Sequence, residues 1–147
     1  MTTIAYKDGV IAYDGRATTG SGTIVYDDLD KCVERDGVKF VLCGNTCGIH
    51  KLIEAYFGES HTSVNTDALI VVDGEVWYIS HDDDEGIEKS QVLLDRPYAL
   101  GSGSDHAYTA MDMGATAYQA VEMAAKRDTS TGGTIRTVLL AEPGKAG

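Results

Sequence analysis

Three Asp-Gly dipeptides constrain the fold of this chain more than any other feature of its sequence. They are Asp8-Gly9, Asp36-Gly37 and Asp73-Gly74, and each separates two runs of apolar or alternating residues. Asp-Gly accepts the positive φ angles that both central residues of a type I′ turn require, so each pair predicts a β-hairpin. Segment 40–43 is an unbroken apolar run, which is typical of a strand buried on both faces. The sequence therefore predicts a protein rich in antiparallel strands.

Apolar residues recur at helical spacing in three other segments. These are 49–57, a segment that begins near Ser104, and 117–125. The last of the three starts with a capping box, in which Thr116 is followed three residues later by Gln119. Its alanine-rich face indicates close packing against a neighbouring element. The sequence therefore predicts three helices in addition to the hairpins.

The order of these elements indicates an α+β fold. A strand over 134–140 follows the last helix, and residues 142–147 form a tail with no visible core role. Helices on the outer faces of two stacked antiparallel sheets would bury every apolar stripe. We therefore expect a four-layer αββα sandwich of two antiparallel sheets with outer helices. We expect it to form one domain that spans 1–147.

Composition and charge exclude several classes of protein. The chain has 147 residues, of which 43% are hydrophobic and 24% charged, as in ordinary globular proteins. It has no apolar run of the roughly 20 residues that cross a bilayer and no signal-peptide pattern, so we expect a cytoplasmic protein. A net charge of -11 without a basic cluster argues against nucleic acid as a partner. Cys32, Cys43 and Cys47 match no zinc or redox pattern, and we expect them to be buried thiols.

The start of the chain offers one chemical possibility. Thr2 follows Met1, and a threonine hydroxyl is a weak nucleophile unless a base lies beside it. If Met1 is removed, the free α-amine of Thr2 can act as that base. Such an amine titrates at about 8 in model peptides, and a neighbouring ammonium group lowers this pKa by like-charge repulsion. Many chains begin with Met-Thr, so this feature carries little weight alone.

Five further segments give it weight, because they follow one another in a specific order. They are Val10–Thr18, Lys31, Gly44, Gly101–Ser104 and Lys126–Gly133. In this order and spacing the chain resembles the proteasome β-subunit and its bacterial relative, the HslV peptidase. Both are N-terminal-nucleophile (Ntn) hydrolases. The first fifteen residues resemble the start of HslV, whereas the Lys-Arg-Asp-x-x-Thr-Gly-Gly stretch resembles the proteasome β-subunit, which usually has serine where Thr131 stands.

The resemblance implies a role for each matching residue. Thr2 matches the nucleophile, and Asp14 and Lys31 match the acid and the lysine that pair beside it. The backbone N–H of Gly44 matches the oxyanion donor. The residues that match the group around the N-terminal amine are Ser102, Asp128 and Thr131. The residues that match substrate contacts are Thr18, whose backbone would pair with an extended peptide, Leu42, which would wall the specificity pocket, and Thr46.

Taken singly, these positions have structural explanations as well. Asp14 precedes a glycine and could be a turn residue, and Lys31 could be a solvated strand end. The chain also departs from the family pattern between about 49 and 66, where one of two long helices is missing or reduced. The resemblance implies ring contacts in that region, so ring size and docking of an ATPase are left open.

No motif predicts a metal or a cofactor. The acidic run 81–85 lacks the ligand spacing of a calcium loop, and we interpret it as a solvated loop. The four histidines show no paired spacing of the HExxH kind. His106 lies beside Ser104 and Asp105, but residues so close in sequence rarely face one another as a triad. We therefore expect no metal and no cofactor.

These observations favour a threonine peptidase that cleaves polypeptide substrates inside a homo-oligomer, either a ring or stacked rings. An ATP-dependent unfoldase is a further candidate partner. Two alternatives stay open. One is an Ntn amidase that acts on a small molecule and needs no ring, and the other is an inactive assembly or binding protein that keeps the scaffold.

Overall fold

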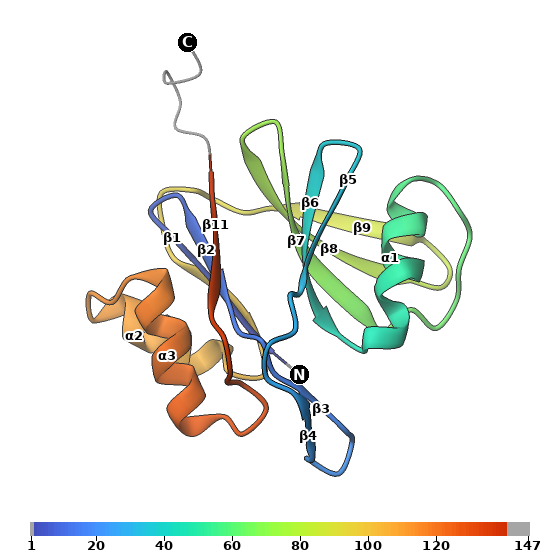
Figure 1. The fold of residues 1–147 in the computed structure, drawn as a ribbon. Coiled ribbons are helices and arrows are strands. Elements are labelled where there is room, and N and C mark those ends of the chain that lie inside the picture. Colours follow the sequence, from blue (N-terminus) through green and yellow to red (C-terminus); the bar gives the residue numbers. More distant parts are fainter. Residues whose placement is uncertain (1, 141–147) are drawn as a thin grey trace. The chain divides into compact units, whose positions relative to one another are not determined.

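The computed structural model describes residues 2–140, which form two compact units (Figure 1). The first unit joins the N-terminal segment through Lys31 with the segment from Leu93 onward. The second unit is Cys32–Val92. Each unit carries an antiparallel sheet and at least one α-helix.

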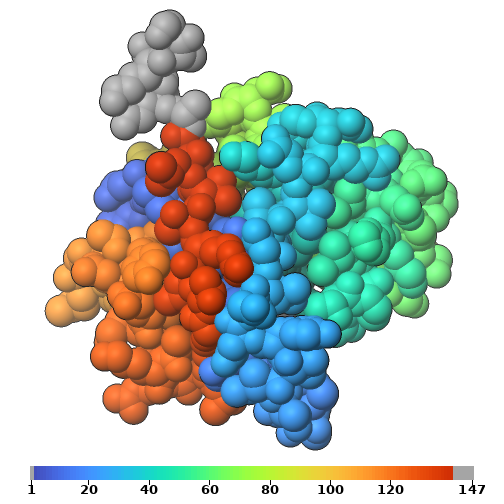
Figure 2. Space-filling view, in the orientation of Figure 1, coloured from blue at the N-terminus to red at the C-terminus, as the bar shows by residue number. Residues whose placement is uncertain are grey.

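The sheet of the first unit is antiparallel throughout, in the order β10-β1-β2-β11. Its strands are β1 (Thr3–Lys7), β2 (Val10–Tyr13), β10 (Tyr98–Gly101) and β11 (Arg136–Leu139). The turn between β1 and β2 is the predicted Asp8-Gly9 pair, with φ angles of 51° and 81°. A separate short hairpin, β3 (Ala17–Thr18) with β4 (Ile24–Tyr26), stands out at the surface in Figure 2.

Two helices cover this sheet, α2 (Ser104–Asp112) and α3 (Ala117–Arg127) (Figure 1). The Thr116 hydroxyl accepts from the N–H of Gln119 at 3.1 Å, and the Gln119 side chain accepts from the N–H of Thr116 at 3.0 Å. This predicted capping box fixes where α3 begins. The contact between helices and sheet is built from small side chains, including Ala5, Ala12 and Ala120. Small side chains let the helix and the sheet approach closely, as the alanine-rich face predicted.

The second unit is a five-stranded sheet in the order β5-β6-β7-β8-β9. Its strands are β5 (Cys32–Arg35), β6 (Val38–Gly44), β7 (Thr66–Val72), β8 (Glu75–Asp82) and β9 (Gly86–Gln91). A 3-10 turn, η1 (Thr46–Gly48), leads into helix α1 (Ile49–Tyr56), which packs on the sheet through a core that contains Phe40, Leu52 and Ile70. Between β6 and β7, α1 is the only α-helix.

Most of the predicted elements are confirmed, with bounds that differ by a few residues. All three Asp-Gly hairpins form, the segment 40–43 is buried, and the three helices lie where their periodicity placed them. The last strand covers Arg136–Leu139 within the expected 134–140, and the tail 142–147 lies outside the described residues. The α+β class is confirmed: the first unit has a four-stranded sheet with α2 and α3, and the second has a five-stranded sheet with α1.

Three features differ from the expectations. The hairpin of β3 and β4 and the edge strand β9 were not predicted, because these strands are short or largely polar and exposed. The expectation of buried thiols is wrong for Cys47, which is exposed, and Cys32 is half-buried.

Among the described helices, none is long and apolar enough to cross a membrane.

Candidate active site

Thr2 lies immediately before β1 and is buried, with 1% of its surface exposed. Its Oγ1 donates a hydrogen bond to Oδ1 of Asp14 and accepts one from Nζ of Lys31. The Lys31 ammonium also lies 2.8 Å from Oδ1 of Asp14. The structure thus brings together three residues that are 12 and 29 positions apart in the sequence, and the threonine hydroxyl touches both charged groups.

Asp14 follows the end of β2 and is fully buried. Besides Thr2 and Lys31, its Oδ1 accepts the N–H of Thr3 at 3.2 Å. Its Oδ2 accepts the N–H groups of Gly132 at 2.9 Å and Arg16 at 3.2 Å. Both carboxylate oxygens are therefore acceptors, and Lys31 balances the buried charge. An Asp-Gly turn residue on the surface would have neither property, so the structural explanation for Asp14 as a simple turn residue does not fit.

The segment that precedes Lys31 in the sequence positions its side chain. This segment is itself held by several hydrogen bonds. The N–H of Leu29 donates to the carbonyl of Gly15 at 3.0 Å, and Tyr13 Oη donates to Asp30 at 2.8 Å. The Arg136 guanidinium donates to the carbonyl of Leu29 at 3.0 Å. These bonds tie the segment to β2 and β11. As a result Lys31 is 7% exposed and is not a solvated strand end.

A second polar cluster lies around Asp128, at the end of α3. Asp128 accepts hydrogen bonds from Oγ of Ser102 at 2.5 Å, Oγ1 of Thr131 at 2.6 Å and the N–H of Ser130 at 3.1 Å. Burial raises the pKa of Asp128, but these hydrogen bonds outweigh burial and hold its pKa below the ordinary value. The carboxylate therefore stays charged and orients the two hydroxyl groups.

Thr3 connects the two clusters. Its hydroxyl lies 2.7 Å from Oγ1 of Thr131, while its N–H is bonded to Asp14. Oγ of Ser102 also approaches the carbonyl of Thr2 at 3.4 Å. Six of the predicted site residues therefore form one continuous hydrogen-bond network. They are Thr2, Asp14, Lys31, Ser102, Asp128 and Thr131.

Two glycines make this arrangement sterically possible. Gly101 has φ +100°, and a Cβ atom there would lie 1.9 Å from the carbonyl oxygen of Thr2. A Cβ atom at Gly103 would lie 2.2 Å from the hydroxyl of Thr3. The strand-to-helix connection of 101–104 must therefore lack side chains at these positions, and its close approach holds the start of β1 in place.

Three residues of this region were not given a role from the sequence. Thr3 and Gly132 bond to Asp14, and Arg16 fastens the loop that carries Gly132. The Arg16 guanidinium donates to Asp27 at 2.8 Å and to the carbonyl of Thr129 at 3.1 Å, and the hydrogen bond lowers the pKa of Asp27. Arg16 and Gly132 stand inside the segments that carried the resemblance, but sequence spacing does not show which backbone groups meet a carboxylate.

The other predicted residues belong to other elements. Thr18 is in β3, where it pairs with Ile24 of β4. Leu42 and Gly44 lie on β6 of the second unit, and Thr46 opens η1 and is exposed. Gly44 has φ +111°, and Leu42 is buried in the core beneath α1. The roles assigned to these four residues in catalysis or substrate binding stay predictions.

Comparison with known proteins identifies the fold. No family model matches the chain, and no curated protein does. Eukaryotic HslV from Trypanosoma brucei matches at 16% identity with a TM-score of 0.72, covering 96% of this chain and 99% of HslV. Thiobacillus denitrificans BPH matches at 19% identity with a TM-score of 0.66, covering 97% of this chain and 98% of BPH. BPH in complex with epoxomicin gives 0.64, also at 19% identity, with 96% of this chain and 99% of that one covered.

The chain therefore has the α+β fold that HslV and BPH share. Nearly the full length of each chain takes part in the match.

Proposed function

We propose that this protein is a threonine peptidase whose nucleophile is the hydroxyl of Thr2. The observation that carries the proposal is the position of that hydroxyl, buried between the carboxylate of Asp14 and the ammonium of Lys31. A structural threonine has no need of a buried ion pair beside it. Removing charges from water costs several kcal/mol per ion, so such a pair is more typical of a site that uses it.

The reaction begins when Met1 is removed and the α-amine of Thr2 becomes free. Oγ1 of Thr2 attacks the carbonyl carbon of the peptide bond and its proton passes to this amine. Lys31 donates to Oγ1 and stabilises negative charge on it, and Asp14 holds Lys31 in position. The N–H of Gly44 is proposed to stabilise the oxyanion of the tetrahedral intermediate, a contribution of about 2.7–4 kcal/mol for such a donor.

The intermediate then collapses. The carbon–nitrogen bond breaks, the departing amine takes the proton from the Thr2 amine, and an ester of Thr2 remains. Water, activated by the same amine, attacks the ester and releases the second product with the free hydroxyl. Ser102, Asp128 and Thr131 are proposed to hold the amine through both steps, since their network ends at the carbonyl of Thr2.

The substrate, the assembly and the location follow from the similarity of fold. HslV and BPH have this fold, and one solved structure of BPH contains epoxomicin. We propose that this chain cleaves polypeptides, forms a homo-oligomer whose interior holds the sites, works with an ATP-dependent unfoldase, and resides in the cytoplasm. Thr18, Leu42 and Thr46 are the proposed substrate contacts.

The test compares Thr2→Ala with the matched variant Thr109→Ala, whose threonine is exposed on α2. Intact mass spectrometry of the protein from its own host should show a chain that lacks Met1. That protein should hydrolyse a fluorogenic peptide, epoxomicin should block the hydrolysis, and Thr2→Ala should abolish it while Thr109→Ala does not. Full activity in Thr2→Ala, or retention of Met1 in the host, would refute the proposal.

Light scattering separates the peptidase from the amidase alternative. A peptidase that encloses its sites must be an oligomer under assay conditions. An active monomer that hydrolyses small amides and spares peptides would support the amidase instead.

A further inference from the structure

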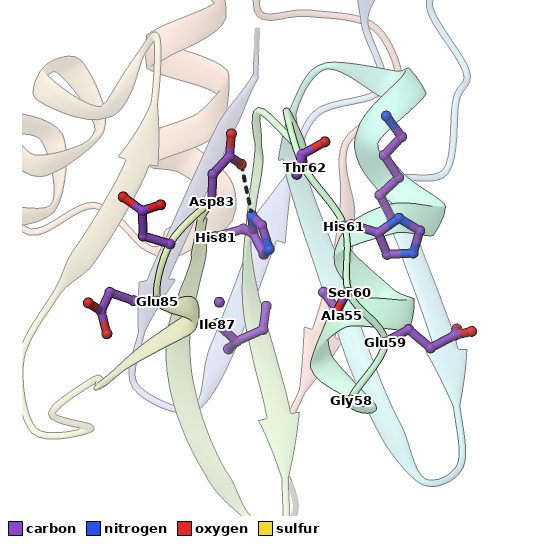
Figure 3. A pocket seen from close by; sticks show the side chains of 13 residues that line it. Ala55, Gly58, Glu59, Ser60, His61, Thr62, His81, Asp83, Glu85 and Ile87 are labelled. Carbon is purple, nitrogen blue, oxygen red and sulfur yellow. Dashed lines mark ion pairs between the residues drawn. The ribbon is translucent and has the colours of Figure 1, made fainter.

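A cavity of the second unit, about 630 Å³, is lined by none of the residues proposed for peptide cleavage. It is lined by the end of α1 and the loop after it on one side, and by the turn between β8 and β9 on the other (Figure 3). The N–H of Ser63 donates to Oδ1 of Asp83 at 2.9 Å and ties the two sides together. Four carboxylates line the cavity against a single lysine, Lys51. This charge pattern favours a cation.

A set of metal-ligating atoms lies at the α1 edge of the cavity; two of its residues, Glu59 and His61, line the cavity, and Glu54 stands beside them. Glu54, Glu59 and His61 each offer one such atom, and all three atoms lie within 4.8 Å of one another. Nε2 of His61 is 2.8 Å from a carboxylate oxygen of Glu54. Zinc bonds of about 2.0–2.1 Å in a tetrahedron place two ligand atoms about 3.3 Å apart. The distance between Nε2 of His61 and the Glu54 oxygen therefore needs to increase by only a few tenths of an ångström. Glu59 is exposed, so its side chain can rotate toward these two atoms.

The opposite wall of the cavity carries a buried polar atom without a hydrogen-bond partner within residues 2–140. His81 lines the cavity from β8, and its side chain is 4% exposed. Among the described residues its Nδ1 is the one buried side-chain nitrogen or oxygen that has no hydrogen-bond partner. The nearest acidic atom, Oδ1 of Asp83, is 3.7 Å away, which is too long for a hydrogen bond (Figure 3). A buried polar atom without a partner costs about 1–3 kcal/mol, so it favours a polar occupant of the cavity.

We propose that this set of residues at the edge of the cavity is a binding site for a borderline divalent transition-metal ion such as Zn²⁺. Glu54, Glu59 and His61 supply three protein ligands, and water fills the fourth position, as is usual for an open zinc site. Magnesium and calcium prefer oxygen ligands alone, and the imidazole of His61 selects against them.

The ion would fasten the loop that follows α1. Its proposed ligands come from the last turns of the helix, from the residue after Gly58 and from the loop itself, so that one ion would link three backbone positions. The site is independent of Thr2 and of peptide hydrolysis, and the two proposals can fail separately.

The test is isothermal titration of the full-length, tag-free protein with ZnCl₂. The background variant Cys47→Ser removes an exposed thiol that would bind zinc by itself. In that background we expect one ion per chain to bind at free zinc below about 100 μM, and MgCl₂ to produce no binding. His61→Ala and Glu59→Gln should each weaken binding at least tenfold. His50→Ala, on the exposed side of α1, should bind as the background does.

Two measurements keep the test decisive. Zinc should raise the midpoint of thermal unfolding in the background protein and in His50→Ala, but not in His61→Ala, and EDTA should reverse the rise. Both proposed ligand variants change partly or fully exposed side chains, so they should fold. Absence of saturable one-to-one binding, or equal zinc affinity in His61→Ala and the background, overturns the proposal.

Discussion

Replacing Asp14 by asparagine tests whether the buried ion pair is organised as the structure indicates. Both carboxylate oxygens accept hydrogen bonds, one from Thr2, Thr3 and Lys31 and the other from backbone N–H groups. An asparagine amide carries donors on one side, so either orientation sets its NH₂ group against other donors. The substitution also leaves the ammonium of Lys31 buried without a counter-charge. Removal of one partner of a buried pair typically costs about 3–5 kcal/mol.

That loss is a large fraction of the 5–15 kcal/mol that ordinarily stabilises a domain. In urea, with a slope of about 2 kcal/mol per molar, a loss of about 4 kcal/mol moves the unfolding midpoint down by about 2 M. The matched control is Asp112→Asn, an exposed aspartate at the end of α2, which should change the free energy of unfolding by no more than about 0.5 kcal/mol.

A double variant shows whether the cost comes from the charge left behind. In Asp14→Asn/Lys31→Met no uncompensated ammonium remains, so we expect it to regain at least about 1 kcal/mol relative to Asp14→Asn. The measurement is urea unfolding followed by far-ultraviolet circular dichroism for the unchanged protein, the two single variants Asp14→Asn and Lys31→Met, and the double variant. A loss below about 1 kcal/mol in Asp14→Asn, or simple additivity in the double variant, would refute the reasoning.

Two further substitutions test neighbouring parts of the site. Gly101→Ala and Gly114→Ala both place a side chain at positive φ, +100° and +109°, but only the side chain at position 101 meets an atom within 4 Å. Urea unfolding should therefore show Gly101→Ala to be less stable than Gly114→Ala by about 2 kcal/mol or more. Equal losses in the two variants would contradict the close approach of Gly101 to Thr2. The pKa of Asp128 is lower in the folded protein than in the unfolded chain. The stabilising effect of its carboxylate is therefore present above the unfolded-state pKa and is lost as the pH falls through the folded-state pKa. Asp128→Asn should lose stability at about pH 6 and little at about pH 2–3, and a pH-independent loss would count against the charged network.

The sequence predicted the local parts of the fold well and the long-range parts less well. Asp-Gly turns and the capping box of α3 depend on neighbouring residues, so they could be read directly. The strand β9 pairs with β8 although it is mostly polar and exposed, because backbone bonding to a partner, not a hydrophobic pattern, holds it in place. Apart from Thr2, the residues of the site were nominated by resemblance alone. Their meeting depends on contacts across up to 128 positions, such as that between Thr3 and Thr131, and periodicity carries no signal for these.

The register of the β1–β2 hairpin explains why the site forms where it does. The two-residue turn at Asp8-Gly9 pairs Lys7 with Val10, and the same register pairs Ile4 with Tyr13. The next residues in each direction are Thr3 and Asp14, which therefore meet at the open end of the hairpin. Since side chains alternate between faces, a slip of one residue would turn Thr3 and the strand core to the wrong side. The turn residues thus act on the site from the far end of the strands, by fixing the register that brings the start of the chain to Asp14.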